Sequence, residues 1–211
     1  MVETSIIARR TFLVGTAAAG LAALPGCTSM GGFSFVEAIR RLLEVSSQNA
    51  FARLTAPGGF WDSQVARLAL PSVLGGRGRV VENILASTLF RDRLQRAFND
   101  VAVDGARRAA PMVADTVRMI GIQNAIDLVR GGPSDATAFL RQNMAGSLIN
   151  AMVPALGDGL RVASDPLVGQ LIAGLTGVDV SSVAQGFARD VDDAIWREIG
   201  LEEASIRRNP Q

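Results

Sequence analysis

The chain of 211 residues carries 21 basic and 20 acidic side chains, and it contains one Cys and no His, Lys or Tyr. These absences exclude serine–histidine and cysteine–histidine catalysis within one chain, Schiff-base chemistry, a lysine-bearing phosphate loop, and zinc or copper sites built on imidazole or thiolate. The formal net charge of +1 offers no electrostatic basis for binding nucleic acid. We therefore assign no catalytic residue, no metal and no cofactor, although Asp and Glu still allow carboxylate chemistry.

The first 26 residues are typical of a cleaved export signal. Arg9-Arg10 followed by Phe12-Leu13 resembles the twin-arginine signature, with the general secretory route as the alternative. The uncharged run from 11 to 24 has 14 residues, fewer than the about 20 apolar residues of a membrane-spanning helix. The run therefore fits a signal better than a permanent anchor.

The segment at 24–27, Leu-Pro-Gly-Cys, resembles a bacterial lipobox. In proteins with this motif the cysteine becomes the first residue and carries acyl chains, so Cys27 is the predicted lipidation site and the membrane its partner. The alternative is an ordinary free thiol at the signal boundary. Thr28 favours sorting to the outer membrane, and residues 27–33 are expected to form the lipidated cysteine and a flexible tether on the periplasmic side.

From residue 34 onward, apolar side chains recur every three to four positions, which predicts helices almost throughout. The first is expected to begin at Ser34, three residues before Glu37, and to reach residue 54. A short segment follows the break at 56–59, and a glycine-rich loop covers 74–78. Further helices are expected over 80–109, from Pro111 to about 120, over 122–130, from 134 to 152, after 166, and over 180–199. The prediction is one all-α domain of seven to nine helices over residues 34–211, with little sign of strands.

Several phrases of the chain occur together in a known order. They are Pro-Gly-Gly-Phe-Trp-Asp at 57–62, Ala-Ala-Pro at 109–111, Ile-Asp-Leu-Val-Arg-Gly-Gly at 126–132, Asp-Ala-Thr-Ala-Phe-Leu-Arg at 135–141, and the closing Ile-Arg-Arg-Asn-Pro at 206–210. The chain resembles the bacterial family called domain of unknown function 4197 over roughly residues 34–211. The resemblance implies an exported helical protein, and it implies no activity because none is established for the family.

The block from 127 to 141 is the first candidate for a binding site. A helix that begins beside two glycines presents free N–H groups, which can bind an anion with arginines nearby. The alternative is a plain helix–turn–helix, in which the glycines turn with positive φ and the hydroxyl side chains cap the second helix. The candidate residues are Asp127, Arg130, Gly131, Gly132, Ser134, Asp135, Thr137 and Arg141.

The densest acidic patch lies near the end of the chain. It consists of Asp190, Asp192, Asp193, Glu202 and Glu203. Its spacing does not match a calcium loop, and arginines four residues away favour ordinary exposed ion pairs over a cation site. Both Trp61 and Trp196 are expected to be core or lid residues rather than ligand-stacking ones.

Three functional hypotheses remain. Because 48% of the residues are apolar, the chain has either a deep core or exposed apolar surface. The leading hypothesis is a non-catalytic, lipid-anchored envelope protein that binds an apolar ligand or a protein partner. The second is a carboxylate hydrolase acting on an envelope polymer, with acids drawn from Asp62, Asp115, Asp127 and Asp135. It gains support if Asp127 and Asp135 face one cleft and loses support if they are solvated. The third hypothesis is a structural spacer, which predicts no pocket.

Overall fold

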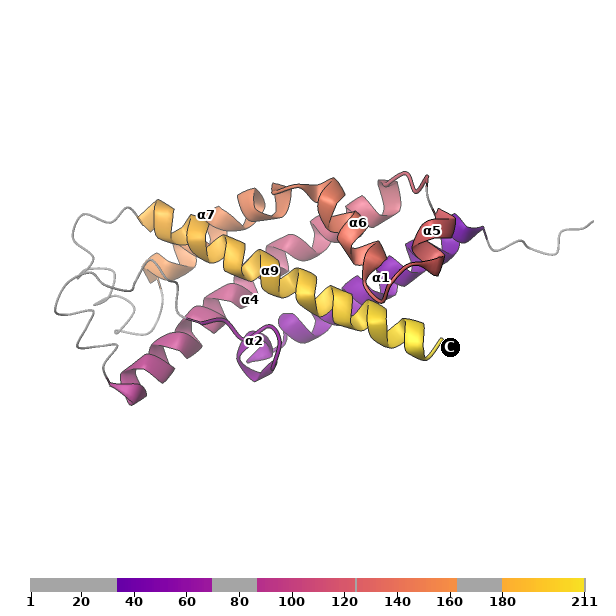
Figure 1. Ribbon diagram of the computed structural model, residues 1–211. Coiled ribbons are helices and arrows are strands. Elements are labelled where there is room, and N and C mark those ends of the chain that lie inside the picture. The colour runs from indigo at the N-terminus through magenta and orange to yellow at the C-terminus, as the bar shows by residue number, and fades with distance from the viewer. Residues whose placement is uncertain (1–33, 70–86, 124, 163–179, 211) are drawn as a thin grey trace, which may run out of the picture. The chain divides into compact units, whose positions relative to one another are not determined.

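The computed structural model describes residues 34–69, 87–123, 125–162 and 180–210, which form seven helices and no strand (Figure 1). The prediction of an all-α fold is therefore confirmed. The helices are α1 Phe35–Leu54, α2 Gly59–Asp62, α4 Thr88–Met119, α5 Ala125–Arg130, α6 Asp135–Met144, α7 Ser147–Val162 and α9 Val180–Arg208. Within the described residues, no helix is both long and apolar enough to cross a bilayer.

Several predictions fall outside the described residues and stay predictions. These are the export signal, Cys27, the tether, the glycine-rich loop at 74–78 and the apolar helix after residue 166. The first helix begins as expected, because the Ser34 hydroxyl accepts a hydrogen bond from the Glu37 N–H at 3.1 Å.

The predicted helix start at Pro111 is wrong, because this proline lies inside α4. Proline lacks an N–H group and removes one backbone hydrogen bond from a helix interior. Here the helix continues because its buried face continues. Ala109, Val113 and Val117 are all buried along it, on both sides of the proline.

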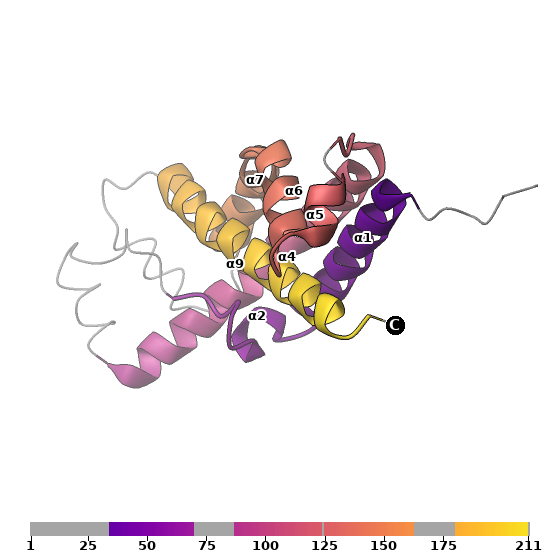
Figure 2. The same ribbon diagram turned by 45° about the vertical axis from the view of Figure 1, so that its right-hand side comes forward.

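The two longest helices, α4 and α9, form the frame of the domain. They have 32 and 29 residues, so they span about 48 Å and 43 Å. Both α1 and α7 pack against both of these helices, and the short helices α5 and α6 lie over α1 and α9 (Figures 1 and 2).

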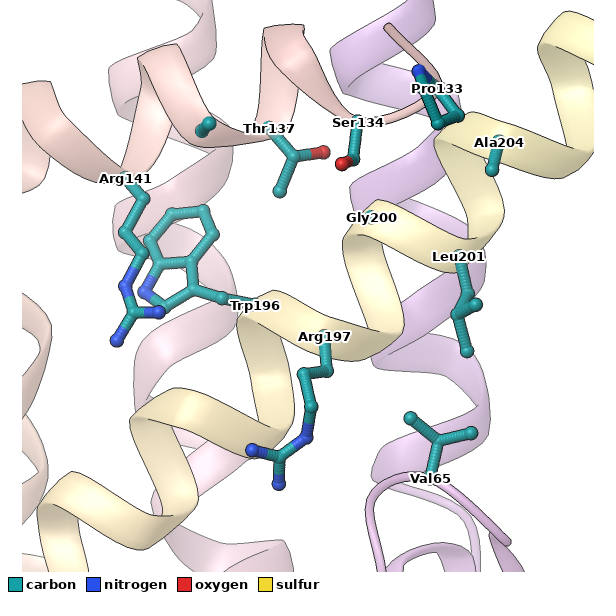
Figure 3. Close-up of a pocket in the computed structure, with 11 residues that line it drawn as sticks. Val65, Pro133, Ser134, Thr137, Arg141, Trp196, Arg197, Gly200, Leu201 and Ala204 are labelled. Atoms are coloured by element: carbon teal, nitrogen blue, oxygen red, sulfur yellow. The ribbon is translucent and has the colours of Figure 1, made fainter.

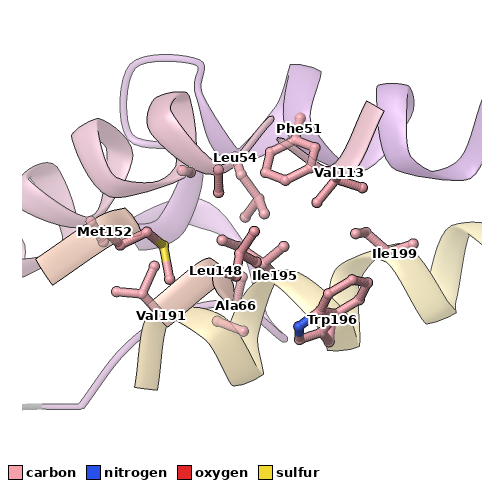
Figure 4. Close-up of a cluster of buried hydrophobic side chains, with 14 of the residues drawn as sticks. Phe51, Leu54, Ala66, Val113, Leu148, Met152, Val191, Ile195, Trp196 and Ile199 are labelled. Atoms are coloured by element: carbon pink, nitrogen blue, oxygen red, sulfur yellow. The ribbon is translucent and has the colours of Figure 1, made fainter. Parts of the chain in front are cut away.

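A continuous apolar core lies between these helices (Figure 4). Phe98 of α4 and Phe187 of α9 are fully buried and meet edge to face, with ring centroids 5.1 Å apart. Glycines bring α7 close to α4. A Cβ at Gly105 would lie 2.9 Å from Leu156, and one at Gly159 would lie 2.8 Å from Val101. Small residues therefore set the spacing of these two helices.

Candidate functional site

A groove of about 480 Å³ lies between α6 and α9, and the segment after α2 forms one of its sides (Figure 3). We call it the α6–α9 groove. Most of its lining side chains are small or apolar, two are hydroxylic and two are arginines. The lining residues are Val65, Pro133, Ser134, Thr137, Ala138, Arg141, Trp196, Arg197, Gly200, Leu201 and Ala204.

The buried carboxylate of Glu203 holds the first turn of α6 against α9. It is 0% exposed. It accepts hydrogen bonds from the N–H groups of Ala136 (3.1 Å) and Thr137 (2.7 Å), and from the Thr137 hydroxyl (2.6 Å). The N–H groups at which an external anion was expected therefore already bind an anionic side chain of the protein itself.

The same carboxylate is paired with Arg207, one turn further along α9. The Arg207 guanidinium lies 2.8 Å (Nε) and 2.7 Å (Nη2) from Glu203 Oε1. It also donates to the carbonyl oxygens of Leu128 (2.8 Å) and Val129 (3.1 Å) in α5. The pair thus fixes the last turn of α5 and the first turn of α6 to one face of α9. The expectation that Glu203 belongs to an exposed acidic patch is wrong, because the α5–α6 turn covers it.

The turn between α5 and α6 differs from the prediction in two details. Gly131 and Gly132 do not adopt positive φ, which the described glycines show only at Gly58 and Gly146. The Ser134 side chain makes no capping hydrogen bond. Instead, the Asp135 carboxylate accepts a hydrogen bond from the Gly132 N–H at 2.7 Å. A Cβ at Gly131 would lie 2.5 Å from this carboxylate, so the glycines make room for it.

Arg141 forms the second contact of α6 with α9. Its guanidinium donates to Asp192 at 3.0 Å and also to Asp193. The indole N–H of Trp196 donates to the other oxygen of Asp192 at 2.9 Å. Burial raises the pKa of Asp192, although the hydrogen bonds and charges of Trp196 and Arg141 act in the opposite direction. Most of the charge of Arg141 is therefore balanced within the protein.

Arg197 is the other cation of the groove, and its side chain is exposed at the rim (Figure 3). Its charge lowers the pKa of Asp190, but burial and the charge of Asp193 have larger effects and leave that pKa raised. Among the described lining residues, none is Asp or Glu.

The remaining predicted residues lie away from the groove. Asp127 and Arg130 are exposed on α5, and Asp135 is exposed at the start of α6. None of these three lines the groove. Of the other acids considered for catalysis, Asp62 is in α2, and Asp115 is in α4, where it pairs with Arg118 at 3.1 Å. Within the described part of the chain, no cluster of His, Cys, Asp and Glu is arranged to hold a metal ion.

The sequence matches the family described as "Protein of unknown function (DUF4197)" over residues 29–211. The chain belongs to this family. The resemblance inferred from the sequence phrases is therefore confirmed, and the family carries no described activity. Comparison with curated proteins and with solved structures gives no match.

In this DUF4197 domain the α6–α9 groove adjoins a second one. The second groove, of about 580 Å³, lies along α1, α2 and α9 and shares Val65 and Leu201 with the first. It contains an ion-paired cluster in which Arg53 lies 2.7 Å from Glu198 and also pairs with Glu202. Leu201 is 45% exposed and Val65 37% exposed, so an apolar ridge separates the two hollows.

Sequence reasoning found the α6 side of the groove and missed the α9 side. It identified Ser134, Thr137 and Arg141, but not Gly200 or Ala204. These two small residues lie four positions apart on α9, which places them on one helix face. A Cβ at Gly200 would lie 3.3 Å from the Ser134 Cβ, so α6 and α9 approach each other closely there. The two small residues four positions apart were the signal in the sequence that could have predicted this close approach.

Proposed function

We propose that this DUF4197 protein is a non-catalytic, lipid-anchored binding module of the cell envelope, and that its α6–α9 groove binds the acyl chain of a lipid. One observation carries the proposal. The described lining is apolar, small or hydroxylic apart from two arginines, and it contains no carboxylate. The volume of about 480 Å³ falls within the range of small-molecule sites. The predicted export signal and the lipobox cysteine support the location.

The expected affinity follows from the partial burial of the chain. Each buried methylene contributes about 0.8 kcal/mol, so half-covering about ten of them gives roughly 4 kcal/mol, a dissociation constant of about 1 mM. A charge-assisted contact adds about 1.5–3 kcal/mol. Because aspartates already engage Arg141, we assign this contact to Arg197. A ligand with an anionic head group is then expected to bind at about 10–100 µM.

The alternative is a carboxylate hydrolase of an envelope polymer. That chemistry needs two carboxylates facing one cleft within about 10 Å of each other. Asp127 and Asp135 are both exposed and neither lines the α6–α9 groove, and Asp115 pairs with Arg118 on α4. Asp62 lines the second groove, but the two carboxylates that share this groove with it, Glu198 and Glu202, are both paired with Arg53. This distribution favours binding over hydrolysis.

The test uses a chain that begins at residue 28, because it retains the whole compact unit Phe33–Gln211. The fluorescence of Trp196, which lines the groove, is followed during titration with a saturated fatty acid and with the fatty alcohol of equal length. We expect saturable binding that is about 10- to 100-fold tighter for the acid. Arg197→Gln should remove this difference while leaving the alcohol unaffected.

Two further variants locate the site. Ala138→Trp fills the groove from an exposed position, and Leu201→Glu places a charge at its edge. Both should weaken binding of the alcohol at least about fivefold. Ile126→Glu is the matched control, because Ile126 is 47% exposed on α5 and lies outside the groove. Binding that is equal in all three variants would show that the groove is not the lipid site, and capture of a protein partner without lipid would replace the proposal.

A further inference from the structure

The first turn of α4 exposes two large apolar residues side by side. Leu89 is 81% exposed and Phe90 is 46% exposed. In both views the N-terminal turns of α4 extend beyond α2, with no other described helix alongside them (Figures 1 and 2). Exposed apolar residues on a single protein are usually scattered, so an adjacent pair at a helix end indicates a contact surface.

Positive charge surrounds this pair. Residues 88–93 contain Arg91 and Arg93 against one acid, Asp92, whereas the whole chain is nearly neutral. Arg96, further along α4, lies over the ring of Trp61 instead. The first turn of α4 has no acidic residue, and the side chain of Ser87 makes no capping hydrogen bond. The positive end of the helix dipole therefore adds to the charge of the arginines.

The spacing along the helix matches the depth of a lipid interface. With a rise of about 1.5 Å per residue, Arg91 and Arg93 lie about 3 Å and 6 Å behind Leu89 along the helix axis. Apolar side chains of interfacial helices reach about 5–10 Å into the boundary between head groups and acyl chains, and basic side chains stay at the level of the phosphates. Leu89 and Phe90 can therefore insert while Arg91 contacts head groups.

We propose that the N-terminal turn of α4 is a docking surface for an anionic lipid bilayer, with Leu89 and Phe90 inserted and Arg91 at the phosphates. This contact is separate from the α6–α9 groove and from the predicted acyl chains on Cys27. Several acyl chains hold a protein stably but leave its orientation free, so the contribution of a second contact is orientation. The docking surface thus orients the domain on the membrane that carries its anchor.

The test is vesicle flotation of the chain from residue 28, which lacks the anchor. Vesicles of equal parts phosphatidylglycerol and phosphatidylethanolamine are compared with vesicles of phosphatidylcholine alone. We expect binding to the anionic vesicles only, and a decrease as salt is raised. Leu89→Glu/Phe90→Glu should reduce the partition coefficient at least about tenfold, and Arg91→Gln should reduce it about fivefold.

Two controls keep the result specific. Met119→Glu changes an equally isolated apolar residue, 79% exposed at the other end of α4, and should alter partition less than about twofold. Ala138→Trp should also leave it unchanged, which separates this surface from the groove. All variants are checked for unchanged helicity and unfolding midpoint.

Insertion itself is measured with Phe90→Trp and lipids brominated on their acyl chains. Quenching of the new tryptophan, above that of the two native ones in the unsubstituted chain, is the expected result. The proposal is overturned by equal binding of Leu89→Glu/Phe90→Glu, or by equal binding to both kinds of vesicle. It is also overturned if light scattering shows that these two substitutions dissociate a dimer, because a second copy of the chain would then occupy the surface.

Discussion

Replacing Glu203 by alanine is the most informative perturbation of this fold. Its carboxylate is completely buried and lies within 3.1 Å of two backbone N–H groups, one hydroxyl and the guanidinium of Arg207. Glu203→Ala leaves the two backbone N–H groups and the hydroxyl without this acceptor in a buried place, and it removes the counter-charge of Arg207, which keeps only its hydrogen bonds to the Leu128 and Val129 carbonyl oxygens. The guanidinium side chain itself is only 17% exposed, so its charge is left largely uncompensated.

The expected loss of stability depends on which groups lose their hydrogen-bond or charge partners. Breaking a buried ion pair by removing one partner costs about 3–5 kcal/mol. Each buried donor left without an acceptor costs about 1–3 kcal/mol, but the three neutral donors are neighbours and their losses do not add. We expect Glu203→Ala to lower the free energy of unfolding by about 4–5 kcal/mol, a third or more of the stability of an ordinary domain.

A double-mutant cycle separates the charge from the hydrogen bonds. Arg207→Met removes the guanidinium but keeps a side chain of similar length, and alone it leaves Glu203 buried without its counter-charge. The double variant contains no unpaired charge, so it should be more stable than the sum of the single effects predicts, by at least about 1.5 kcal/mol. Urea unfolding followed by helical circular dichroism measures all four proteins. A loss below about 1 kcal/mol for Glu203→Ala, or additive single effects, would refute the reasoning.

Three other predictions use the same assay. Burial raises the pKa of Asp192 above 3.8, its value in the unfolded chain, so at a pH above 3.8 the folded state holds this proton more tightly than the unfolded state. The free energy of unfolding of the wild type, relative to that of Asp192→Asn, should therefore fall as the pH rises from 3.8. A difference that does not change with pH contradicts this. Asn99→Ala should lower the free energy of unfolding by about 2 kcal/mol, because the Asn99 amide is 1% exposed and forms hydrogen bonds with both the N–H and the C=O of Leu68. A loss under about 0.5 kcal/mol would show that water replaces the amide. Gly59→Ala should lower the free energy of unfolding by about 3 kcal/mol, because the new Cβ would lie 2.2 Å from the Arg53 carbonyl oxygen. Gly121→Ala is the control and should be nearly neutral, because nothing lies near the position of its Cβ. Equal effects of the two substitutions would refute the steric argument.

The helical architecture was predictable because each helix carries its own periodic apolar face. The exception at Pro111 shows the limit of local rules. A proline is usually a helix start or break, but the buried residues Ala109 and Val113 on either side pack against the rest of the core. Tertiary packing outweighs one lost backbone hydrogen bond, and the local sequence does not contain that information.

The site was only half predictable, for a related reason. The α6 side was visible as a glycine turn followed by hydroxyl and acidic residues. Its real partner, Glu203, is 67 residues further along the chain than Ala136, to which it binds. In the sequence, Glu203 resembles a member of an exposed charged patch. Only the folded structure shows that the α5–α6 turn covers it, since burial depends on which distant segment lies above a residue.

Three buried acids set the position of α9. Asp192, Glu198 and Glu203 are each less than 10% exposed, and each pairs with an arginine, from α6, α1 and α9 respectively. An apolar helix face alone tolerates displacement by a turn, whereas such a shift would separate Asp192 and Glu198 from their arginines on other helices. It would also take Glu203, whose arginine lies on α9 itself, away from the N–H groups of α6. Buried ion pairs therefore add more to the register of α9 than to overall stability.

This register explains why the α6–α9 groove keeps its shape. α6 is only ten residues long and contacts α9 through Thr137, held by Glu203, and through Arg141, held by Asp192. Ala138 lies between these two contacts and lines the groove. A groove fixed on both sides loses little freedom when a ligand binds, so its affinity depends mainly on the apolar surface it covers. Arg141→Met removes one of these contacts and leaves the buried Asp192 without its counter-charge, so it should lower both the free energy of unfolding and the affinity for lipid. Urea unfolding and the fluorescence titration measure the two effects, and an unchanged affinity would show that this contact does not shape the groove.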